Sequence, residues 1–328
     1  MSSALSGLRL DLLNLLTLLS ALALAMTGSA LLPQRGAGRA RAATRAASLR
    51  PAELEHLPDG RKALRDARGI LVPLLDYRRI ASGTLVADRV LVDLCEPDRV
   101  LAYSRAAEQT PSAHRYVGKP TLDTRDGVER VLALKPDLLI VSELVDASYL
   151  ARLEERGIRV FALGPMQGIS TLLPEIRALG LMIGAEARAD QYARTLQQRL
   201  ENVAREVPTG ARARTLYLSI YGDKLFASAA ATSYHDVIGY AGLSDAAAVA
   251  GLTGWPELTG ERVLALDPEV LVTRTGMSPL LCRHPGLELL RPCRGQGRII
   301  ELDGALLDDP GPAMLEAAEA LHAASFRR

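Results

Sequence analysis

A segment of 13 residues occurs twice in this chain, and this repeat constrains the fold more than any other feature. Residues 129–141 read ERVLALKPDLLIV and residues 261–273 read ERVLALDPEVLVT, with 8 of the 13 positions identical. Each copy predicts a short helix, a turn at the proline and a buried apolar strand. Because the copies begin 132 residues apart, they indicate two similar α/β lobes and not a short-period solenoid. Small ligands often bind in the cleft between two such lobes.

Strands and helices alternate on both sides of the repeated segment. This alternation predicts parallel sheets with helices on their faces. At the start of the first lobe, a hairpin is expected around Asp59-Gly60. The strands are expected at residues 80–82, 100–103, 138–141, 158–163 and 216–221, and the helices at residues 85–94, 149–156 and 234–241.

The segment between the two copies is predicted to be helical throughout. Apolar residues at helical spacing over residues 169–179 predict one helix, which Gly180 and Gly184 are expected to interrupt. No turn signal follows between residues 186 and 206, so a continuous helix about 30 Å long is expected there. Its position makes it the connector of the two lobes, and a helical connector is stiff.

The N-terminus predicts export from the cytoplasm. An apolar run over residues 12–26 follows Arg9 and precedes the small residues 27–30, as in a signal peptide. An uncleaved membrane anchor is the alternative. The predicted organisation is a signal peptide at 1–30, an Arg/Ala-rich linker at 31–54, an N-terminal lobe at 55–166, a helical connector at 167–208 and a C-terminal lobe at 209–328.

Composition and motifs exclude several classes of function. The 328 residues are 48% apolar and carry a net charge of +1, without a basic patch suited to nucleic acid. No zinc-protease helix, phosphate-binding glycine loop or serine nucleophile elbow is present in the sequence. The 5 histidines are scattered without metal-ligand spacing. No resident cofactor and no catalytic residue is therefore predicted.

The chain has 3 cysteines, Cys95, Cys282 and Cys293. An exported protein can form disulfides, and a bond between Cys282 and Cys293 would close a short loop. Two buried thiols are the alternative. Cys95 lies in an apolar helical run and is predicted to be a free core thiol.

Polar and aromatic residues gather where strands are predicted to end. Ligands of open parallel sheets bind at the carboxyl ends of strands. Although each aromatic ring could simply cap the core, a group of them suits a large, rigid, partly apolar ligand such as a macrocycle or a chelate. His235 could be an axial donor to haem iron or an ordinary residue at a helix start. The candidate ligand-binding residues are Thr84, Tyr103, Tyr116, Glu143, Tyr221, Tyr234, His235, Trp255, Thr275 and Met277.

Glu129 and Glu261 occupy the same position in the two copies. A carboxylate in the first turn of a helix is favoured by the helix dipole. Two such carboxylates, one on each lobe, could also engage arginines of a two-fold symmetric partner.

These features resemble the periplasmic binding proteins that serve ATP-driven importers of cobalamin, haem and ferric siderophores. The resemblance covers about residues 55–325 and includes Arg79-Ile-Ala-Ser82, Val117-Gly118-Lys119, both repeat segments, the closing strand at 297–302 and the helix at 312–321. Residues 255–261, WPELTGE, are similar to the cobalamin-binding members, in which the tryptophan lines the cleft, and Tyr221-Gly222 matches another cleft aromatic.

The resemblance implies two similar lobes with parallel sheets on one long helix, and a monomer that binds but does not catalyse. It implies a small-molecule metal chelate as ligand: a ferric siderophore, haem or cobalamin. It also implies that Glu129 and Glu261 dock onto arginines of a permease dimer, which works with its ATPase, on the periplasmic side. Two alternatives are open: a chelatase-like enzyme that pairs His235 with Glu143, and a receptor that senses its ligand without a transporter.

Overall fold

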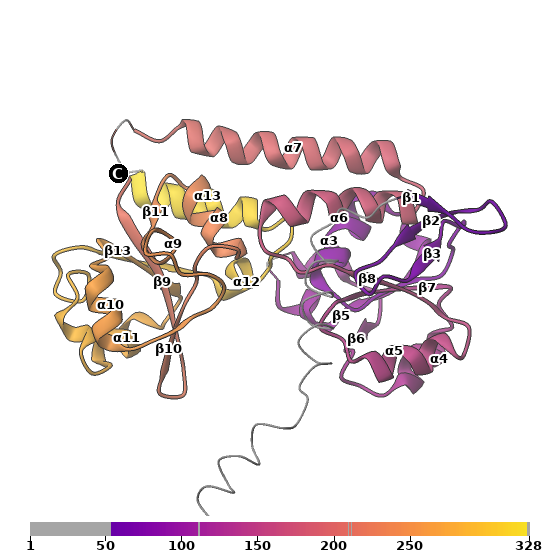
Figure 1. Cartoon of the computed structure of the whole chain (residues 1–328), viewed down its shortest axis with the longest axis horizontal. Coiled ribbons are helices and arrows are strands. Elements are labelled where there is room, and N and C mark those ends of the chain that lie inside the picture. The colour runs from indigo at the N-terminus through magenta and orange to yellow at the C-terminus, as the bar shows by residue number, and fades with distance from the viewer. Residues whose placement is uncertain (1–53, 111, 209, 211, 327–328) are drawn as a thin grey trace, which may run out of the picture. The chain divides into compact units, whose positions relative to one another are not determined.

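A computed structural model gives the structure of residues 54–326, except residues 111, 209 and 211. The predicted signal peptide and all of the predicted linker except Leu54 lie outside these residues. Within the described part of the chain, no helix is both long enough and apolar enough to cross a membrane. Two α/β lobes are present, and helices α6 (Ile169–Met182) and α7 (Glu186–Arg205) follow the first lobe in the chain (Figure 1).

The N-terminal lobe contains a sheet of 5 parallel strands in the order β6-β5-β4-β7-β8. Residues 138–141 in its centre are all 0% exposed, because helices cover both faces of a parallel sheet. Helices α3 (Leu85–Leu94) and α6 pack on one face, and α4 (Val128–Leu134) and α5 (Ala147–Glu154) pack on the other. The strands are β4 (Ile80–Ser82), β5 (Val100–Ser104), β6 (Thr121–Leu122), β7 (Leu138–Ser142) and β8 (Arg159–Leu163).

A small antiparallel sheet precedes this lobe. It consists of β1 (Leu54–His56), β2 (Lys62–Arg65) and β3 (Leu71–Pro73) in sequential order. Gly60, with a φ of 82°, forms the turn between β1 and β2, where the sequence predicted a hairpin.

The central strands of the C-terminal sheet are parallel, as predicted, but its edge is antiparallel, so the sheet as a whole is mixed. Strands β9, β13 and β14 pair in parallel, but β10 and β12 are antiparallel to their neighbours in the order β12-β10-β9-β13-β14. A tight turn at Gly222 folds β10 back on β9, so this edge is a hairpin and not a helical crossover. The strands are β9 (Arg214–Tyr221), β10 (Lys224–Ala227), β11 (Ser244–Asp245), β12 (Glu257–Leu258), β13 (Val270–Arg274) and β14 (Arg298–Leu302).

The two copies of the repeat adopt the same structure. Helix α10 (Gly260–Leu266) corresponds residue for residue to α4, and β13 corresponds to β7. Each helix ends on a residue in the left-handed region, Lys135 with a φ of 48° and Asp267 with a φ of 43°. The predicted duplication of a helix, a turn and a strand is therefore confirmed.

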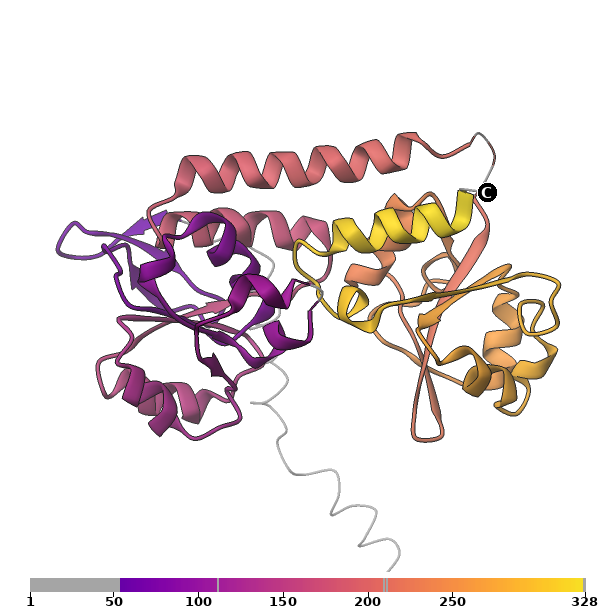
Figure 2. The same ribbon diagram turned by 180° about the vertical axis from the view of Figure 1, so that it is seen from behind.

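Helix α7 is the predicted long connector. Its 20 residues span about 30 Å, and it packs against α6 and against α8 (Ser233–Tyr240) and α13 (Met314–Phe326) of the C-terminal lobe. Both ribbon views show α7 running alongside α6 and α13 (Figures 1 and 2). One hydrophobic cluster continues from α3 and α6 through α7 to α8 and α13.

Gly180 does not interrupt α6, contrary to the prediction. The helix continues to Met182, and Gly184 follows its end with a φ of 72°. A Cβ atom at position 180 would lie 2.2 Å from the Cβ of Ala189 on α7. Gly180 is therefore a point of close contact between two helices.

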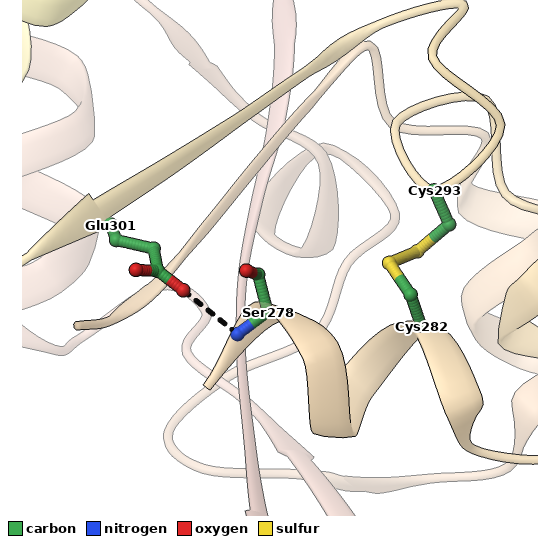
Figure 3. Close-up of a disulfide and its surroundings, with 4 residues drawn as sticks. All are labelled: Ser278, Cys282, Cys293 and Glu301. Atoms are coloured by element: carbon green, nitrogen blue, oxygen red, sulfur yellow. Dashed lines mark hydrogen bonds between the residues drawn. A yellow bond between two sulfur atoms is a disulfide. The ribbon is translucent and has the colours of Figure 1, made fainter. Parts of the chain in front are cut away.

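A disulfide lies beside the C-terminal sheet, where α11 (Ser278–Arg283) packs. Cys282 of α11 is bonded to Cys293, as expected from the sequence, with 5.4 Å between their Cα atoms (Figure 3). At the other end of α11, Glu301 of β14 accepts a hydrogen bond of 2.9 Å from the backbone N–H of Ser278. Cys95 is free and buried, as predicted.

Candidate ligand-binding site

The carboxyl ends of β4, β5 and β6 surround a hollow of about 330 Å³ in the N-terminal lobe. Thr84 lines it and is the N-cap residue of α3. In this lobe, a pocket therefore lies at the carboxyl ends of the strands, where the sequence predicted ligand binding. Other residues that line the hollow are Gly83, Ser104, Arg105, Gln109, Asp123 and Arg125.

A buried carboxylate supports the floor of this hollow. Both carboxylate oxygens of Asp88, on α3, lie 3.1 Å from the backbone N–H of Ser104, and one also accepts from the Ser104 hydroxyl. Burial raises the pKa of Asp88 to about 7, although the hydrogen bonds from Ser104 oppose the shift. This bond fixes α3 to the end of β5.

The wall of the hollow is charged but internally paired. Arg105 contacts Asp126 at 2.7 Å and Asp123 at 3.3 Å, and Arg125 contacts Asp123 at 2.6 Å. The hydrogen bonds from Arg125 hold the pKa of Asp123 well below its usual value. Both arginines of the wall are therefore already paired with a carboxylate.

In the C-terminal lobe, three polar side chains meet where β9, β13 and β14 end. Arg274, the last residue of β13, donates to Asp308 Oδ1 at 2.7 Å and to the Tyr221 hydroxyl at 3.2 Å. The Tyr221 residue is 57% exposed, and the Arg274 side chain is 34% exposed. A partly exposed guanidinium suits a carboxylate or a phosphate on a ligand.

An aromatic cluster adjoins these polar groups. Tyr234 packs on Tyr217 with ring centroids 4.4 Å apart, and Trp255 lies edge-on to Tyr234 at 4.8 Å. Tyr234 is buried and its hydroxyl donates to Asp308 at 2.7 Å, whereas Trp255 is 48% exposed. Burial raises the pKa of Tyr234, so its phenol remains a donor. Trp255 is thus partly exposed to solvent while it packs against two buried tyrosines, Tyr217 and Tyr234.

His235 has a structural partner. Its Nδ1 atom lies 2.9 Å from Asp245 Oδ2, and the other oxygen of Asp245 accepts from the backbone N–H groups of Ala247 and Ala248. His235 therefore links the start of α8 to the Asp245 cap of α9 (Ala246–Val249), and its side chain is 38% exposed. Its contact with a ligand stays a prediction. Within the described residues, no group of three or more His, Cys, Asp or Glu side chains could hold a metal ion.

The structure does not bring all the predicted ligand residues to a surface. Tyr103 and Tyr116 pack edge-to-face at 4.8 Å in the core and are 4% and 5% exposed, so the expectation that both rings line a ligand surface is wrong in this structure. They are buried because α3 and a short 3-10 helix, Ala113–Tyr116, cover them. Glu143 and Thr275 are exposed and Met277 is half-buried at the ends of β7 and β13.

Arg274 and Asp308 join Tyr221 to Tyr234, against which Trp255 packs, yet Arg274 escapes prediction from the sequence. One signal could have revealed it. The two copies of the repeat differ at the residue that ends each strand, where Ser142 of the first copy corresponds to Arg274 of the second. A charged residue at that edge of only one sheet indicates a site that belongs to one lobe.

Comparison with known proteins identifies the family. The sequence pattern of the periplasmic binding protein family matches residues 80–304. The chain belongs to the periplasmic binding protein family. The match begins at β4 and ends at the start of α12 (Gly304–Leu307), so it includes both sheets, both repeat copies and α7.

Relatives support this assignment. The chain is 25% identical over 206 residues to YvrC, an ABC transporter substrate-binding lipoprotein of Bacillus subtilis. This alignment covers 61% of this chain and 65% of that protein. It is also 26% identical over 247 residues to a cobalamin-binding protein of Halobacterium salinarum. That alignment covers 73% of this chain and 66% of the relative. The chain thus spans just under two thirds of the length of these curated relatives.

Solved structures share the fold. A periplasmic haem-binding protein of Pseudomonas aeruginosa superimposes with a TM-score of 0.64 and 26% identity, over 76% of this chain and 93% of that one. The haem-binding protein HutB of Vibrio cholerae superimposes with a TM-score of 0.67 and 21% identity, over 76% and 98% of the two chains. The architecture of two lobes and one long helix is therefore that of these binding proteins.

Proposed function

We propose that this chain is the substrate-binding protein of an ABC importer, and that it captures a metal-bearing chelate: haem or another ferric chelate, or cobalamin. The observation that carries the proposal is the surface formed by Tyr221, Arg274 and Trp255 at the carboxyl edge of the second sheet. Two exposed aromatic residues and a cation suit a large planar ring that bears carboxylate groups. Relatives that are named for haem or cobalamin support the same ligand class.

The proposed role requires binding and no chemistry. Tyr221 and Trp255 would contact the apolar part of the chelate, Arg274 would pair with its acidic groups, and Thr84 with the hollow in the first lobe would contact its other side. Residues Glu143, Thr275 and Met277 remain candidates for peripheral contacts. The protein would act as a monomer on the periplasmic side after export, without enzymatic activity.

Delivery would depend on Glu129 and Glu261. Both are exposed in the first turns of the matching helices α4 and α10. Carboxylates at matching positions on two lobes suit the arginines of a two-fold symmetric permease that works with its ATPase. Reversing both charges should abolish uptake and leave ligand affinity unchanged.

Trp255, the one tryptophan of the sequence, provides the direct test of binding. The purified protein is titrated with haemin, cyanocobalamin and a ferric siderophore, with correction for light absorbed by these compounds. At least one should quench Trp255 with a micromolar or lower Kd, and Arg274→Ala should weaken binding of an acidic chelate about tenfold, or 1.4 kcal/mol. Arg294→Ala, at an exposed position of the same lobe, is the control. If no chelate changes the emission or co-purifies with the protein, the proposal is rejected.

The chelatase alternative gains no support from the site. It needs a histidine and a carboxylate that face each other across the two lobes, whereas the carboxylate beside His235 is Asp245 of the same lobe, 2.9 Å from Nδ1. Incubation with Fe²⁺ and a metal-free porphyrin should therefore give no metal insertion. A sensing receptor would bind the same ligands but would not stimulate the ATPase of an importer.

A further inference from the structure

The two copies of the repeat agree at buried positions for a simple reason. Val131 and Val263 occupy the same position on α4 and α10, and they are 2% and 0% exposed. Each packs in the hydrophobic cluster beneath its own helix. Close packing limits which side chains fit there, so identity at such positions needs no functional explanation.

Three exposed positions of the helices are also identical, and packing does not explain them. They are Glu129 and Glu261, Arg130 and Arg262, and Ala133 and Ala265, all exposed in both lobes. Residues three and four apart are neighbours on a helix surface, so each alanine adjoins both charged residues of its helix. We define each set of three residues as a docking triad.

One charged surface position of the repeat outside the triads is reversed. Lys135 corresponds to Asp267, whereas Asp137 and Glu269 keep the same charge. The reversal shows that charged surface positions of the repeat can change.

The triad arginines are available to a partner. The Arg130 side chain is 53% exposed, and its single ion pair, at 3.4 Å, is with Asp126, which already contacts Arg105 at 2.7 Å. No ion pair of the Arg262 side chain occurs within residues 54–326 as far as they are described. A shared ion pair therefore does not explain why both positions carry arginine.

We propose that the two triads are bipolar docking faces for one two-fold symmetric protein partner, which presents an acidic side chain beside its arginines. The glutamate of each triad would pair with an arginine of the partner, and Arg130 or Arg262 would pair with the adjacent carboxylate. Ala133 and Ala265 would let the partner approach the helix closely, because they add no bulk. This inference rests on the proposed function and identifies the permease dimer as the partner.

A bipolar face differs from a purely acidic one in orientation. A lone carboxylate can meet a basic patch in many registers, whereas paired opposite charges fix one register and penalise the reversed one. Arginine is also enriched among the residues that dominate interface energies. Each triad would therefore determine the orientation in which its lobe docks onto one half of the partner.

The test uses the full chain and its importer in proteoliposomes. The variant Arg130→Glu with Arg262→Glu should raise the Kd for docking, and the concentration that half-stimulates the ATPase, at least tenfold. The matched control is Arg156→Glu with Arg294→Glu, which makes the same charge change at one exposed position of each lobe and should change either value less than twofold. Ala133→Trp with Ala265→Trp should weaken docking without changing ligand affinity.

The outcomes separate this inference from the proposed function. If wild type does not stimulate the importer, or reversal of Glu129 and Glu261 has no effect, the proposed function fails. If those results are as expected but the arginine variant behaves like its control, only the bipolar face is wrong. Self-association of wild type that the arginine variant abolishes, measured by light scattering, would make a second copy of this chain the occupant and overturn the proposal.

Discussion

Arg89 Nε lies 3.4 Å from Asp309 Oδ2, and these two residues are 220 positions apart in the sequence. Arg89 is on α3 of the N-terminal lobe, and Asp309 lies between α12 and α13 of the C-terminal lobe. They are 8% and 1% exposed. Gly311 packs beside this pair, since a Cβ atom there would lie 3.4 Å from Val86 of α3. A buried ion pair thus joins the segment between α12 and α13 to the first lobe.

Removing Arg89 should therefore destabilise the whole fold. Arg89→Met leaves the Asp309 carboxylate buried without its cation, and the free energy of unfolding should fall by roughly 3 kcal/mol. Arg89→Met combined with Asp309→Asn should recover part of this loss, because no buried charge remains. Urea denaturation followed by circular dichroism measures both effects.

The control for this prediction is Arg205→Met. Arg205 pairs with Glu201 at 3.4 Å on the surface of α7, and its side chain is 70% exposed. Such a pair contributes less than about 0.5 kcal/mol. Equal losses for Arg89→Met and Arg205→Met would show that burial does not strengthen the Arg89 contact.

The repeat explains why so much of the architecture could be predicted. Apolar periodicity is a local property, so the strands of both copies and the uninterrupted α7 follow from the sequence. The hairpin of β9 and β10 does not follow in the same way, because its Gly222-Asp223 turn competes with the expectation that a helix comes after every strand. The sequence predicts a helix break at Gly180 wrongly, because the role of this glycine depends on Ala189 of another helix.

The candidate site was less predictable than the fold. Exposed Tyr221 and Trp255 could be identified because Tyr221 ends strand β9 and Trp255 lies in a loop before β12. Tyr103 and Tyr116 have the same local sequence signal, but they are buried by elements that only the tertiary structure brings over them. The partners of Arg274 come from β9 and from the end of α12, and local patterns cannot reveal such a meeting.

The pH dependence of stability should be set partly by Asp88. Burial raises its pKa to about 7 and that of Asp309 to about 6, both above the unfolded value of about 3.9. The folded state then binds more protons between these values, so the free energy of unfolding should fall as pH rises from about 4 to 7. The slope should not exceed about 1.4 kcal/mol per pH unit for each group.

Asp88→Asn should flatten this dependence. Asparagine retains an oxygen to accept from Ser104 but does not titrate. Urea midpoints at several pH values from 4.5 to 7.5 would give the slope, and Asp76→Asn, at an exposed position, is the control. If the slope is the same in Asp88→Asn and wild type, Asp88 is not its source. The remaining sources would be Asp309 and Glu175, and burial raises the pKa of Glu175 to about 7.

Two helix glycines should respond in opposite directions to substitution by alanine. At Gly180 the new Cβ would lie 2.2 Å from the Cβ of Ala189, so α6 and α7 must separate, and a loss of about 1–3 kcal/mol is expected. At Gly239, inside α8, no atom lies within 4 Å of the new Cβ. Gly239→Ala should therefore stabilise the protein by about 0.5–1 kcal/mol. Thermal unfolding should show a lower Tm for the first variant and a higher Tm for the second; two shifts of the same sign would contradict the packing assigned to Gly180.

The left-handed residues that end α4 and α10 provide a matched pair of glycine substitutions. Lys135 and Asp267 have φ angles of 48° and 43°, a conformation that costs an L-residue about 1–2 kcal/mol. Within the described residues, the one side-chain hydrogen bond to Lys135, from Arg79 at 2.8 Å, is to its backbone carbonyl, which glycine retains, so Lys135→Gly should raise the free energy of unfolding by about 0.5–1 kcal/mol.

Asp267→Gly should not give that gain, although it relieves the same backbone conformation. The Asp267 carboxylate accepts two hydrogen bonds of 2.8 Å from Arg291 and also contacts Arg214. Loss of a bidentate pair offsets the relief of about 1 kcal/mol, so this variant should be neutral or less stable than wild type. Urea unfolding of both variants measures the difference. Equal stabilisation by the two substitutions would mean that the Arg291 pair contributes nothing to the C-terminal lobe.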